Sequence, residues 1–304
     1  MGTFQWKNLF ILVTVVGLLV SSAPAQTAQG RISGTVADPG GAVIPGASVI
    51  AVDEETGVST SATSNHVGLY VLPFLKPGRY SITCSAQGFK RYERTGLIVE
   101  TSQVMGLNIT MELGAVTETV TVAADAPLLQ GTQSGVDQFI DSRAVNDMPL
   151  AGRRALELVK LSSETVFVNY SGGAKPQFAI SGGRSYKSAY VLDGGNIQNL
   201  RMASLQVEID PPVEVIKEFK VVQNGYAAEY GGSASGVLIS TTKSGTNEFH
   251  GSAFEFLRND AFDASGFFAP AEGGKKVKAP LRYNLFGGTI GGPIIRNRTH
   301  FFFG

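Results

Sequence analysis

The chain lacks several features on which common protein chemistry depends. It has one cysteine in 304 residues, so no intrachain disulfide can form, and its three histidines, His66, His250 and His300, lie far apart. No glutamate follows a histidine within four residues, so the close His and Glu spacing of a zinc peptidase is missing. Cys84 has no obvious histidine partner and is expected to be a small buried hydrophobe. The sequence therefore predicts no enzyme, no metal site and no cofactor.

Charge is also scarce, and it is balanced. Lys plus Arg and Asp plus Glu each number 25, and charged residues make up 16% of the chain, below the roughly 25% of ordinary soluble domains. A net charge of zero gives no reason to expect a nucleic-acid partner. Glycine is abundant at 37 residues, and together with Val, Thr and Ser it favours β-strands joined by turns. The composition thus predicts a mainly β protein.

A long apolar run lies near the N-terminus. The run Leu9–Val20 follows the positive Lys7, and as a helix it would measure about 18 Å, too short for a hydrocarbon core of about 30 Å. Ala23-Pro24-Ala25 then matches the small-x-small pattern of a cleavage site. We therefore expect residues 1–25 to be a secretory signal peptide that is cut near Ala25. No cysteine follows the run, so a lipoprotein anchor is not expected.

Residues 26–113 alternate between short β-like runs and turn signals. Runs such as RISGTVAD, GASVIAVD and RYSITCSA are separated by DPGGAVIPG, DEETG and KPG. This spacing predicts a β-sandwich of about 80 residues with every second side chain facing inward. The expected inward residues are Val49, Ala51, Tyr80, Ile82 and Cys84. Through DPGGAVIPGASV, GLYVLPFLKPGRYSITCSAQGFK and NITMEL, the segment resembles the carboxypeptidase regulatory-like domain, a transthyretin-like or immunoglobulin-like sandwich.

The connection over residues 114–129 contains a second kind of strand. Val116, Val120 and Val122 alternate with threonines, which on pattern alone predicts one more β-strand. Its place between the sandwich and a polar stretch also suits a mobile strand that adds to a partner's sheet edge. The run Glu118-Thr119-Val120-Thr121-Val122 resembles the TonB box of TonB-dependent transporters. That resemblance implies a TonB-type energy-transducing partner.

Residues 130–246 mix helical and β patterns and predict an α+β globule. In MPLAGRRALELVKLSS, the apolar positions Leu156, Val159 and Leu161 suit a short amphipathic helix. The Asp193-Gly194 pair predicts a tight turn after a strand. The stretch VEVIKEFKVVQNG reads as a strand in which Ile216 breaks strict alternation.

Residues 247–304 read as the first strands of a membrane barrel. Barrel strands of about ten residues alternate between lipid and lumen, so in NEFHGSAFEFLRND we expect Phe254 and Phe256 to face lipid and Glu255 to face the lumen. A charged loop follows, LRYNLFGGTIGGPII returns, and HFFFG opens a third strand. A glycine-rich soluble hairpin is the alternative. Because an open sheet cannot stand in lipid, we expect further barrel strands beyond Gly304.

Three long motifs carry a family resemblance over these last two segments. YVLDGGNIQN, VEVIKEFKVVQNGYAAEYGGSASGVLISTTKSGTNEFHGSAFEFLRND and RYNLFGGTIGGPIIRNRTHFFFG resemble the plug and first barrel hairpin of Oar-like TonB-dependent receptors. In that family a regulatory-like sandwich precedes the plug. The resemblance implies a plug over 130–246 inside an outer-membrane barrel of about 22 strands that begins at 247.

The same resemblance implies a function and a set of plug residues. It implies ligand binding and TonB-coupled uptake across the outer membrane, with the sandwich and the TonB box on the periplasmic side and the barrel in lipid. Siderophores, glycans, peptides and proteins are all compatible ligands. The candidates for plug turns or lumen contacts, each of which could equally do no more than shape a turn, are Arg184, Asp193, Gly194, Glu229, Gly231 and Gly232.

A different class of function also fits the sequence. The chain could be a secreted or periplasmic adhesion protein whose sandwich binds carbohydrate and whose remainder is a scaffold. Tyr70, Phe74 and Phe89 are the candidate contact residues for this function, although their spacing also fits packing in the core.

Overall fold

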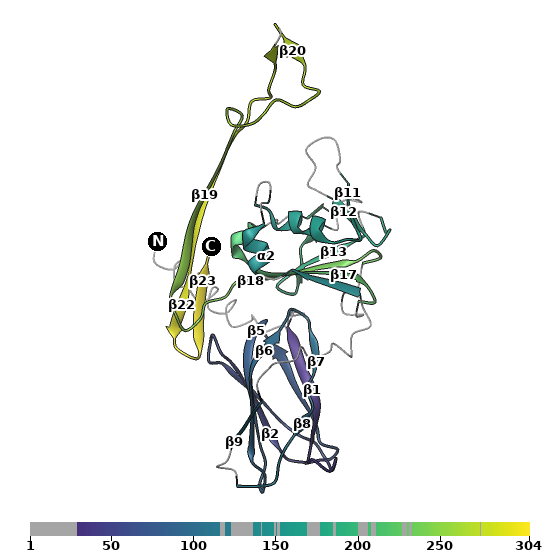
Figure 1. Ribbon diagram of the computed structural model, residues 1–304, viewed down its shortest axis with the longest axis vertical. Helices are drawn as coiled ribbons and strands as arrows, with labels where there is room; N and C mark the ends of the chain where they lie inside the picture. Colours follow the sequence, from purple (N-terminus) through teal and green to yellow (C-terminus); the bar gives the residue numbers. More distant parts are fainter. Residues whose placement is uncertain are drawn as a thin grey trace, which may run out of the picture.

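The computed structural model describes most of the chain. The described residues are 29–304 apart from 116–118, 123–135, 141, 149, 151–152, 169–176, 185–186, 200–205, 208–210, 227–229, 231–232 and 274. They form three parts, which we name the sandwich (Gly30–Thr110), the central domain (Val136–Thr242) and the C-terminal sheet (His250–Phe303). Figure 1 shows the sandwich at one end, with the central domain above it and the C-terminal sheet beside the central domain.

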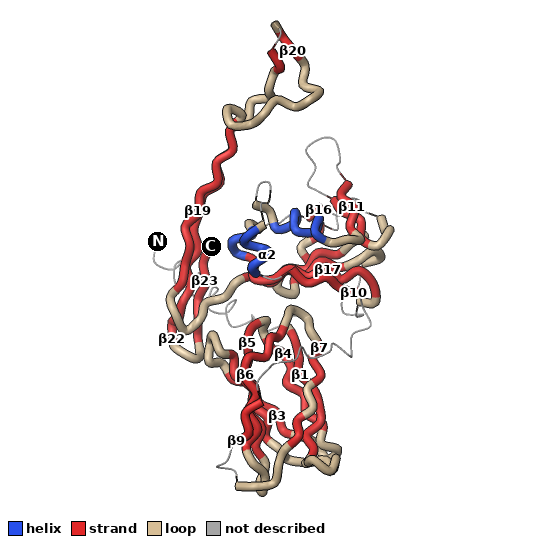
Figure 2. Tube along the Cα trace, viewed as in Figure 1, coloured by secondary structure: helices blue, strands red, loops and turns tan. Residues whose placement is uncertain are grey.

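The protein is mainly β, as the sequence predicts. Strands dominate all three parts, and helix is confined to the central domain in the part of the chain that the structure describes (Figure 2). The α-helix there is α2 (Ser142–Asp147), and two 3₁₀ segments, η1 (Ala155–Leu161) and η2 (Val213–Val215), accompany it. Among the described residues, no helix has the length and apolar character needed to cross a membrane.

Two β-sheets form the sandwich. One has the order β4-β1-β7, with β8 also paired to β1, and the other has the order β3-β2-β5-β6-β9. The strands are β1 (Gly30–Ala37), β2 (Ser48–Asp53), β3 (Ser59–Thr63), β4 (Leu69–Leu75), β5 (Gly78–Ser85), β6 (Arg91–Val99), β7 (Val104–Gly106), β8 (Ile109–Thr110) and β9 (Thr119–Val122). The first eight strands come from the predicted sandwich segment, whereas β9 comes from the connection that follows it.

The sandwich core follows from period-two alternation. The predicted inward side chains on β2 and β5 are all buried, namely Val49, Ala51, Tyr80, Ile82 and Cys84. Each large apolar side chain that folding removes from water contributes about 1.5–3 kcal/mol. The Tyr70 hydroxyl, which is also buried, donates a hydrogen bond to the Leu107 carbonyl oxygen at 2.7 Å. The one polar atom of this large buried side chain is therefore paired within the sandwich.

One glycine allows the sandwich strands to approach closely. Gly34 lies on β1, which pairs with β4 on one side and with β7 and β8 on the other. A Cβ atom at Gly34 would lie 1.8 Å from the backbone carbonyl oxygen of Leu107, far inside any allowed contact. The backbone at this crossing therefore requires glycine.

The central domain is built on a five-stranded sheet with the order β10-β17-β18-β13-β14. Two small hairpins, β11-β12 and β15-β16, accompany it. The strands are β10 (Val136–Ile140), β11 (Thr165–Val168), β12 (Gln177–Ile180), β13 (Ala189–Leu192), β14 (Gly195–Asn196), β15 (Gln198–Asn199), β16 (Gln206–Val207), β17 (Ile216–Asn224) and β18 (Val237–Thr242). The predicted α+β mixture is present, with far less helix than strand.

The helix predicted around Leu156 is a 3₁₀ helix rather than a regular α-helix. Its apolar side is nevertheless placed as expected, because Leu156 and Val159 are fully buried and Leu161 packs against the same core. The break in alternation at Ile216 also has a structural reason. Val213 to Val215 belong to η2, and β17 begins only at Ile216.

The C-terminal sheet is an antiparallel meander with the order β19-β22-β23. Its strands are β19 (His250–Asn259), β22 (Arg282–Ile295) and β23 (Thr299–Phe303), and the long β19–β22 loop carries the short strands β20 (Ala271–Glu272) and β21 (Lys275–Lys276). In Figure 1 this loop projects well beyond the central domain. The three expected strands are thus present in the expected order.

Candidate functional site

The strand that resembles a TonB box is docked on the edge of the sandwich. β9 pairs in parallel with β6, placing Thr119 opposite Arg91 and Val122 opposite Arg94. β9 is the last strand of its sheet, so its second edge has no strand partner among the described residues. Glu118, the first residue of the TonB-box resemblance, lies outside the described residues. Both sequence-based interpretations of this segment therefore describe part of the arrangement: it is a strand, and it lies at an edge.

The residues just before β9 are fixed beside the start of β6. Leu113 forms an isolated antiparallel bridge with Phe89, and the Gly114 amide donates a hydrogen bond to the Gly88 carbonyl oxygen at 3.1 Å. The Lys90 ammonium and the Glu112 carboxylate lie 3.4 Å apart on the same side. These contacts hold the chain beside the start of β6, and Thr119 follows only a few residues later.

β6 has a bulge just beyond the residues that pair with β9. Against β5, Leu97 lies opposite Tyr80 while Arg94 lies opposite Ile82, so β6 carries one extra residue in this interval. Gly96, which lies in the bulge, has a φ of 73°, and its amide donates to the Glu54 carboxylate at 3.0 Å. Bulges bend a strand and end its pairing at a sheet edge. Within the described residues, the docked strand has four residues and ends just before this bulge.

A buried carboxylate joins the sandwich to the central domain. Glu218 on β17 accepts hydrogen bonds from the Thr101 amide at 2.9 Å and from the Thr101 hydroxyl at 2.7 Å. The Thr101 hydroxyl also lies 3.0 Å from the hydroxyl of Thr241 on β18. Burial raises the pKa of Glu218, although the Thr101 hydrogen bonds and the nearby Lys217 and Lys220 ammonium groups oppose the shift.

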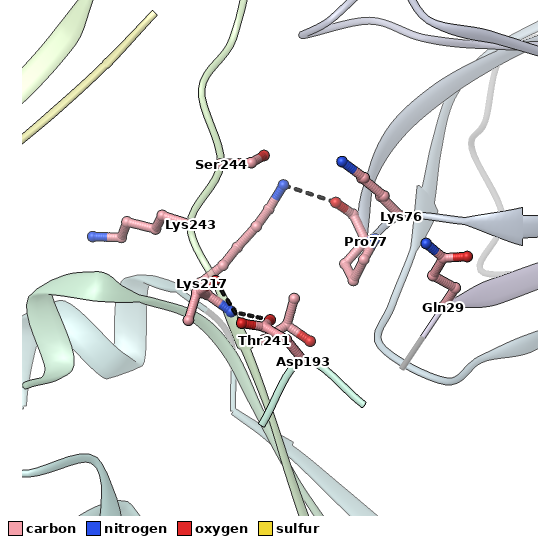
Figure 3. Close-up of a pocket in the computed structure, with 9 residues that line it drawn as sticks. Gln29, Lys76, Pro77, Asp193, Lys217, Thr241, Lys243 and Ser244 are labelled. Carbon is pink, nitrogen blue, oxygen red and sulfur yellow. Dashed lines mark hydrogen bonds between the residues drawn. The ribbon is translucent and has the colours of Figure 1, made fainter. Parts of the chain in front are cut away.

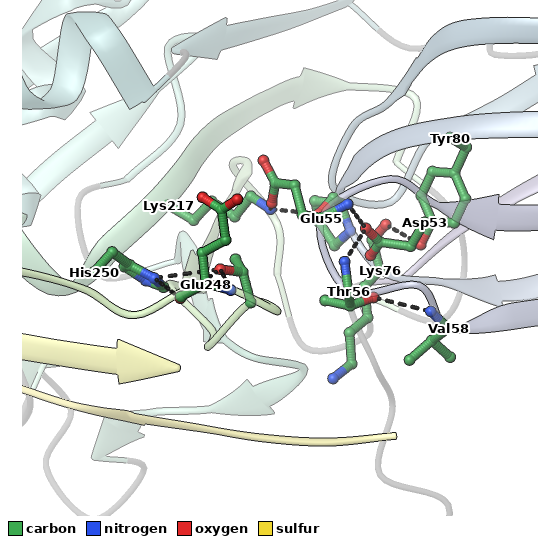
Figure 4. A network of polar contacts seen from close by, with 11 residues as sticks. Asp53, Glu55, Thr56, Val58, Lys76, Tyr80, Lys217, Glu248 and His250 are labelled. Atoms are coloured by element: carbon green, nitrogen blue, oxygen red, sulfur yellow. Dashed lines mark hydrogen bonds and ion pairs between the residues drawn. The ribbon is translucent and has the colours of Figure 1, made fainter. Parts of the chain in front are cut away.

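A turn of the sandwich contacts both other parts. The Lys217 ammonium donates to the Pro77 carbonyl oxygen at 2.8 Å and lies 3.5 Å from the Glu55 carboxylate (Figure 4). The Glu55 carbonyl oxygen accepts from the amide of Asn247, just before β19, at 3.0 Å. Next to it, a Cβ atom at Gly57 would lie 2.1 Å from the Asn297 side-chain oxygen. Residues 54–57 therefore form a junction of all three parts.

A cleft of about 280 Å³ lies between the sandwich and the central domain. Lys76 and Gln29 line it from the sandwich, and Lys217, Asp193 and Lys243 line it from the central domain. Figure 3 shows Lys217 reaching toward Pro77 while Lys243 extends away from the sandwich. Burial lowers the pKa of Lys243, with Arg153 adding to the shift and Glu214 opposing it. Since Lys217 already has two partners, the cleft does not present a convergent group of free cations.

Of the plug candidates, Asp193 and Gly194 are a built turn. Both have positive φ, 49° and 85°, and they connect β13 to its antiparallel neighbour β14 as the sequence predicts. The Asp193 carboxylate accepts from the Thr242 amide and hydroxyl, both at 2.8 Å, and so ties this turn to β18. Arg184 is exposed, and its carbonyl oxygen accepts from the Lys187 amide in a second turn. Glu229, Gly231 and Gly232 lie outside the described residues, as does the predicted cleavage site at Ala25.

The facing of β19 is the reverse of the expected one. The guanidinium of Arg153, from the central domain, lies 4.7 Å from the centre of the Phe256 ring. Phe254 shares this face, with its ring 5.9 Å from that of Phe256, and lies over Gly287, where a Cβ atom would come within 2.8 Å of it. Phe254 and Phe256, which the sequence predicts to face lipid, therefore face the central domain in the structure.

The opposite face of the C-terminal sheet exposes large apolar side chains. Leu257, Phe286, Ile290 and Phe303 are each more than half exposed. Phe286 lies opposite Glu255, so this carboxylate is on the outer face instead of the inner one. The sequence pattern correctly predicted which side chains share a face of β19. It could not predict which face meets the central domain, because that depends on Arg153, which is distant in sequence.

The residues considered for carbohydrate or metal chemistry are scattered. Tyr70 is in the sandwich core and Phe89 packs against it, whereas Phe74 is 73% exposed and has a φ of 59°. Burial raises the pKa of the Cys84 thiol to about 12, so it is a neutral core side chain at physiological pH. Across the described ranges, no group of three or more His, Cys, Asp or Glu side chains could hold a metal ion.

The sequence reading missed the groups that join the parts. Glu218 and Lys220 are buried charged residues within an apolar strand, and Lys220 forms an ion pair with Asp137. Three charged residues between Ile216 and Val222, namely Lys217, Glu218 and Lys220, were a visible signal that this strand meets polar partners. Thr101, in a turn of the sandwich, carries no comparable signal in the sequence.

Comparison with known families agrees with this architecture. Residues 31–112 match the carboxypeptidase regulatory-like domain, and residues 241–304 match a family described as an outer membrane beta barrel domain. The two matches fall on the sandwich and the C-terminal sheet.

Two curated relatives are similar over most of the chain. The TonB-dependent transporter Oar of Myxococcus xanthus is 27% identical over 303 residues, which cover 96% of this chain and 28% of the relative. The TonB-dependent receptor P39 of Formosa agariphila is 24% identical over 264 residues, covering 83% of this chain and 23% of the relative. The chain thus spans about a quarter of the length of these relatives. Among solved structures, the siderophore receptor PirA from Acinetobacter baumannii aligns with 53% of this chain and 22% of its own, at 22% identity and a TM-score of 0.39.

The two family matches give the chain a regulatory-like domain followed by a segment similar to an outer membrane beta barrel domain. Over nearly its whole length, the chain is similar to the TonB-dependent transporter Oar. The names of the two curated relatives describe a transporter and a receptor.

Proposed function

We propose that the chain binds a ligand at the outer membrane and takes part in its TonB-coupled uptake, with β9 as the strand that the energy-transducing partner engages. The observation that carries this proposal is the position of β9. It is extended, pairs with β6 of the sandwich, and has one edge without a strand partner among the described residues. Such a strand can pair with a partner's sheet through main-chain groups alone.

The proposal assigns a task to each part. The sandwich, residues 26–113 after a signal peptide cut near Ala25, lies in the periplasm, and residues 114–129 form the coupling segment. Residues 130–246 are the plug, and residues 247–304 begin the barrel. The contact between Arg153 and Phe256 supports a plug that lies against the inner wall of the barrel.

The outer face of the C-terminal sheet supports a membrane location for these strands. Its exposed Leu257, Phe286, Ile290 and Phe303 are the side chains that lipid tails would cover. Glu255 lies on this face beside Phe286, and Asn284 lies there opposite Leu257, so the face also carries polar side chains.

A cross-linking experiment tests the coupling role. Deletion of residues 118–122 removes the proposed partner strand, and we expect it to abolish cross-linking of the chain to the host's TonB-type protein in whole cells. A deletion of equal length at residues 262–266, in the long loop of the C-terminal sheet, is the control and should leave cross-linking unchanged. If the first deletion cross-links as well as the native chain, this coupling mechanism is wrong.

Carbohydrate binding by the sandwich is less well supported. Of its three candidate contact residues, Phe74 is the one with an exposed ring, because Tyr70 is buried and Phe89 packs on the core. A single exposed ring provides no paired platform for a sugar.

A further inference from the structure

The docked position of β9 raises a question about how a partner reaches it. One edge of β9 is already paired with β6, and the segment before it is anchored by Leu113 and Gly114. Resting on the proposed coupling function, we propose that residues Arg91–Arg94 of β6 are the resting binding site of β9, and that the energy-transducing partner has to displace β9 from this edge.

The anchor makes the intramolecular pairing effective. Only a few residues separate Gly114 from Thr119, so β9 is held close to β6 at all times. A short tether of this kind raises the effective concentration of the strand to the millimolar range. The partner, which arrives from solution, therefore competes with a binding site that is always nearby.

The pairing is also built to be reversible. Among the described residues it extends over four residues and is parallel, and the bulge at Gly96 distorts β6 just beyond it. Parallel pairing is slightly less stable for each residue than antiparallel pairing. A strand held in this way is occupied at rest and can still be released to a partner that offers a longer sheet edge.

If the partner displaces β9 from β6, force reaches the central domain more directly than if the partner pairs with the open edge of β9. While β9 stays on β6, a pull on it loads the sandwich sheet, because β6 is paired with β5 along its other edge. When β9 is released, the pull passes along the chain to β10, at the edge of the central sheet. Release from β6 is thus the step that redirects the load.

An engineered disulfide tests the competition directly. Glu93 and Thr121 lie opposite each other in the β6–β9 register, and Glu93→Cys/Thr121→Cys would lock the strand in place when oxidised. Cys84 is buried in the core and does not take part in the exchange. The probe is the purified periplasmic domain of the host's TonB-type protein, and its affinity is measured for the oxidised and the reduced chain.

The matched control is a disulfide at the other edge of the same sheet. Ile50 and Ser61 lie opposite each other on β2 and β3, so Ile50→Cys/Ser61→Cys leaves β9 free. We expect the Glu93–Thr121 lock to weaken partner binding at least tenfold, with full recovery on reduction, and the control to change it less than twofold. Hydrogen exchange gives a second readout: partner binding should speed exchange of the Arg91–Arg94 amides that face β9.

Each outcome is decisive. If the lock fails to form, or if the locked chain binds the partner as tightly as the reduced chain, β9 does not compete and the inference is wrong, while the coupling function stands. Unchanged exchange at Arg91–Arg94 would show that the partner adds to the open edge, which also overturns the inference. If the reduced and native chains both fail to bind the partner, the proposed coupling function itself fails, and the competition fails with it.

Discussion

The sandwich and the C-terminal sheet both alternate with period two, yet they use the alternation differently. In the sandwich, β5 turns Tyr80, Ile82 and Cys84 into a core that the sandwich itself encloses. In the C-terminal sheet, β22 exposes Phe286 and Ile290 on one side, while its other side meets Phe254 of the neighbouring strand. One part is complete in itself, and the other takes its inner surface from the central domain.

This difference shows what a strand pattern can and cannot specify. Alternation states which side chains share a face, because successive side chains point to opposite sides. It does not state what lies against that face. For the sandwich the answer is the opposite sheet of the same segment, whereas for β19 the answer is Arg153, which is distant in sequence.

The largest effect is expected from breaking the self-contained part. Gly34→Ala places a methyl group against the Leu107 carbonyl oxygen, and the backbone has to move to admit it. We expect a loss of about 4 kcal/mol in the free energy of unfolding of the sandwich, above the 1–3 kcal/mol usual for overpacking because the obstacle is main chain. Urea unfolding followed by hydrogen exchange in β1 and β5 measures it.

Gly106→Ala is the matched control for this substitution. Gly106 lies in the same sheet, on β7, and an added Cβ atom would have nothing within 4 Å. Its cost should stay below about 1 kcal/mol. Equal losses at the two positions would mean that the close approach at Gly34 does not limit the fold.

A somewhat smaller effect is expected where the C-terminal sheet depends on the central domain. Arg153 forms an ion pair with Glu214 at 2.8 Å, and both side chains are mostly buried. Arg153→Met leaves the Glu214 carboxylate buried without its cation, which costs about 3 kcal/mol in the free energy of unfolding. Phe256→Leu removes only the ring beneath the guanidinium and should cost about 1 kcal/mol.

Urea unfolding of the two variants and of the double variant in detergent measures these losses. The double variant should lose less than the sum of the single variants, because Arg153 and Phe256 are in contact. Strict additivity would show that the ring and the guanidinium do not interact, and would remove the evidence for the facing of β19.

The smallest effect concerns the joint between the sandwich and the central domain. Because burial raises the pKa of Glu218, the native state holds its proton more tightly than the unfolded state does. The carboxylate therefore lowers stability as pH rises from its unfolded pKa through its raised native pKa. Glu218→Gln keeps an acceptor for Thr101 without the charge, so we expect it to change stability by less than about 1 kcal/mol at pH 7.

The direction of the pH dependence is the sharper test of this joint. As the pH falls from 7.5 to about 5, the native chain should gain stability relative to the Glu218→Gln variant. Melting temperatures of both proteins across this range provide the measurement. If the difference between them does not change with pH, Glu218 does not titrate as its burial requires.

The sequence could predict the features that depend on residues close together in the chain. The inward residues of β2 and β5 and the Asp193-Gly194 turn follow from neighbours within a few positions, and the structure confirms them. The docking of β9 on β6 and the Thr101–Glu218 joint depend on groups that meet only after folding. Phe256 belongs to this second kind, which explains why its face was predicted the wrong way round.

The junction at residues 54–57 has a mechanical consequence. Glu55 contacts Lys217 and Asn247, while Thr101 separately contacts Glu218, so the sandwich is held at two separate points. Because the sandwich is held at two points, it resists rotation, and β6 stays in place when β9 is pulled. The pull can then act either parallel or perpendicular to β6. Peeling a strand breaks its hydrogen bonds one after another, whereas sliding it along its axis breaks them together. The direction of the pull, and not the number of bonds alone, would then set the force at which β9 is released.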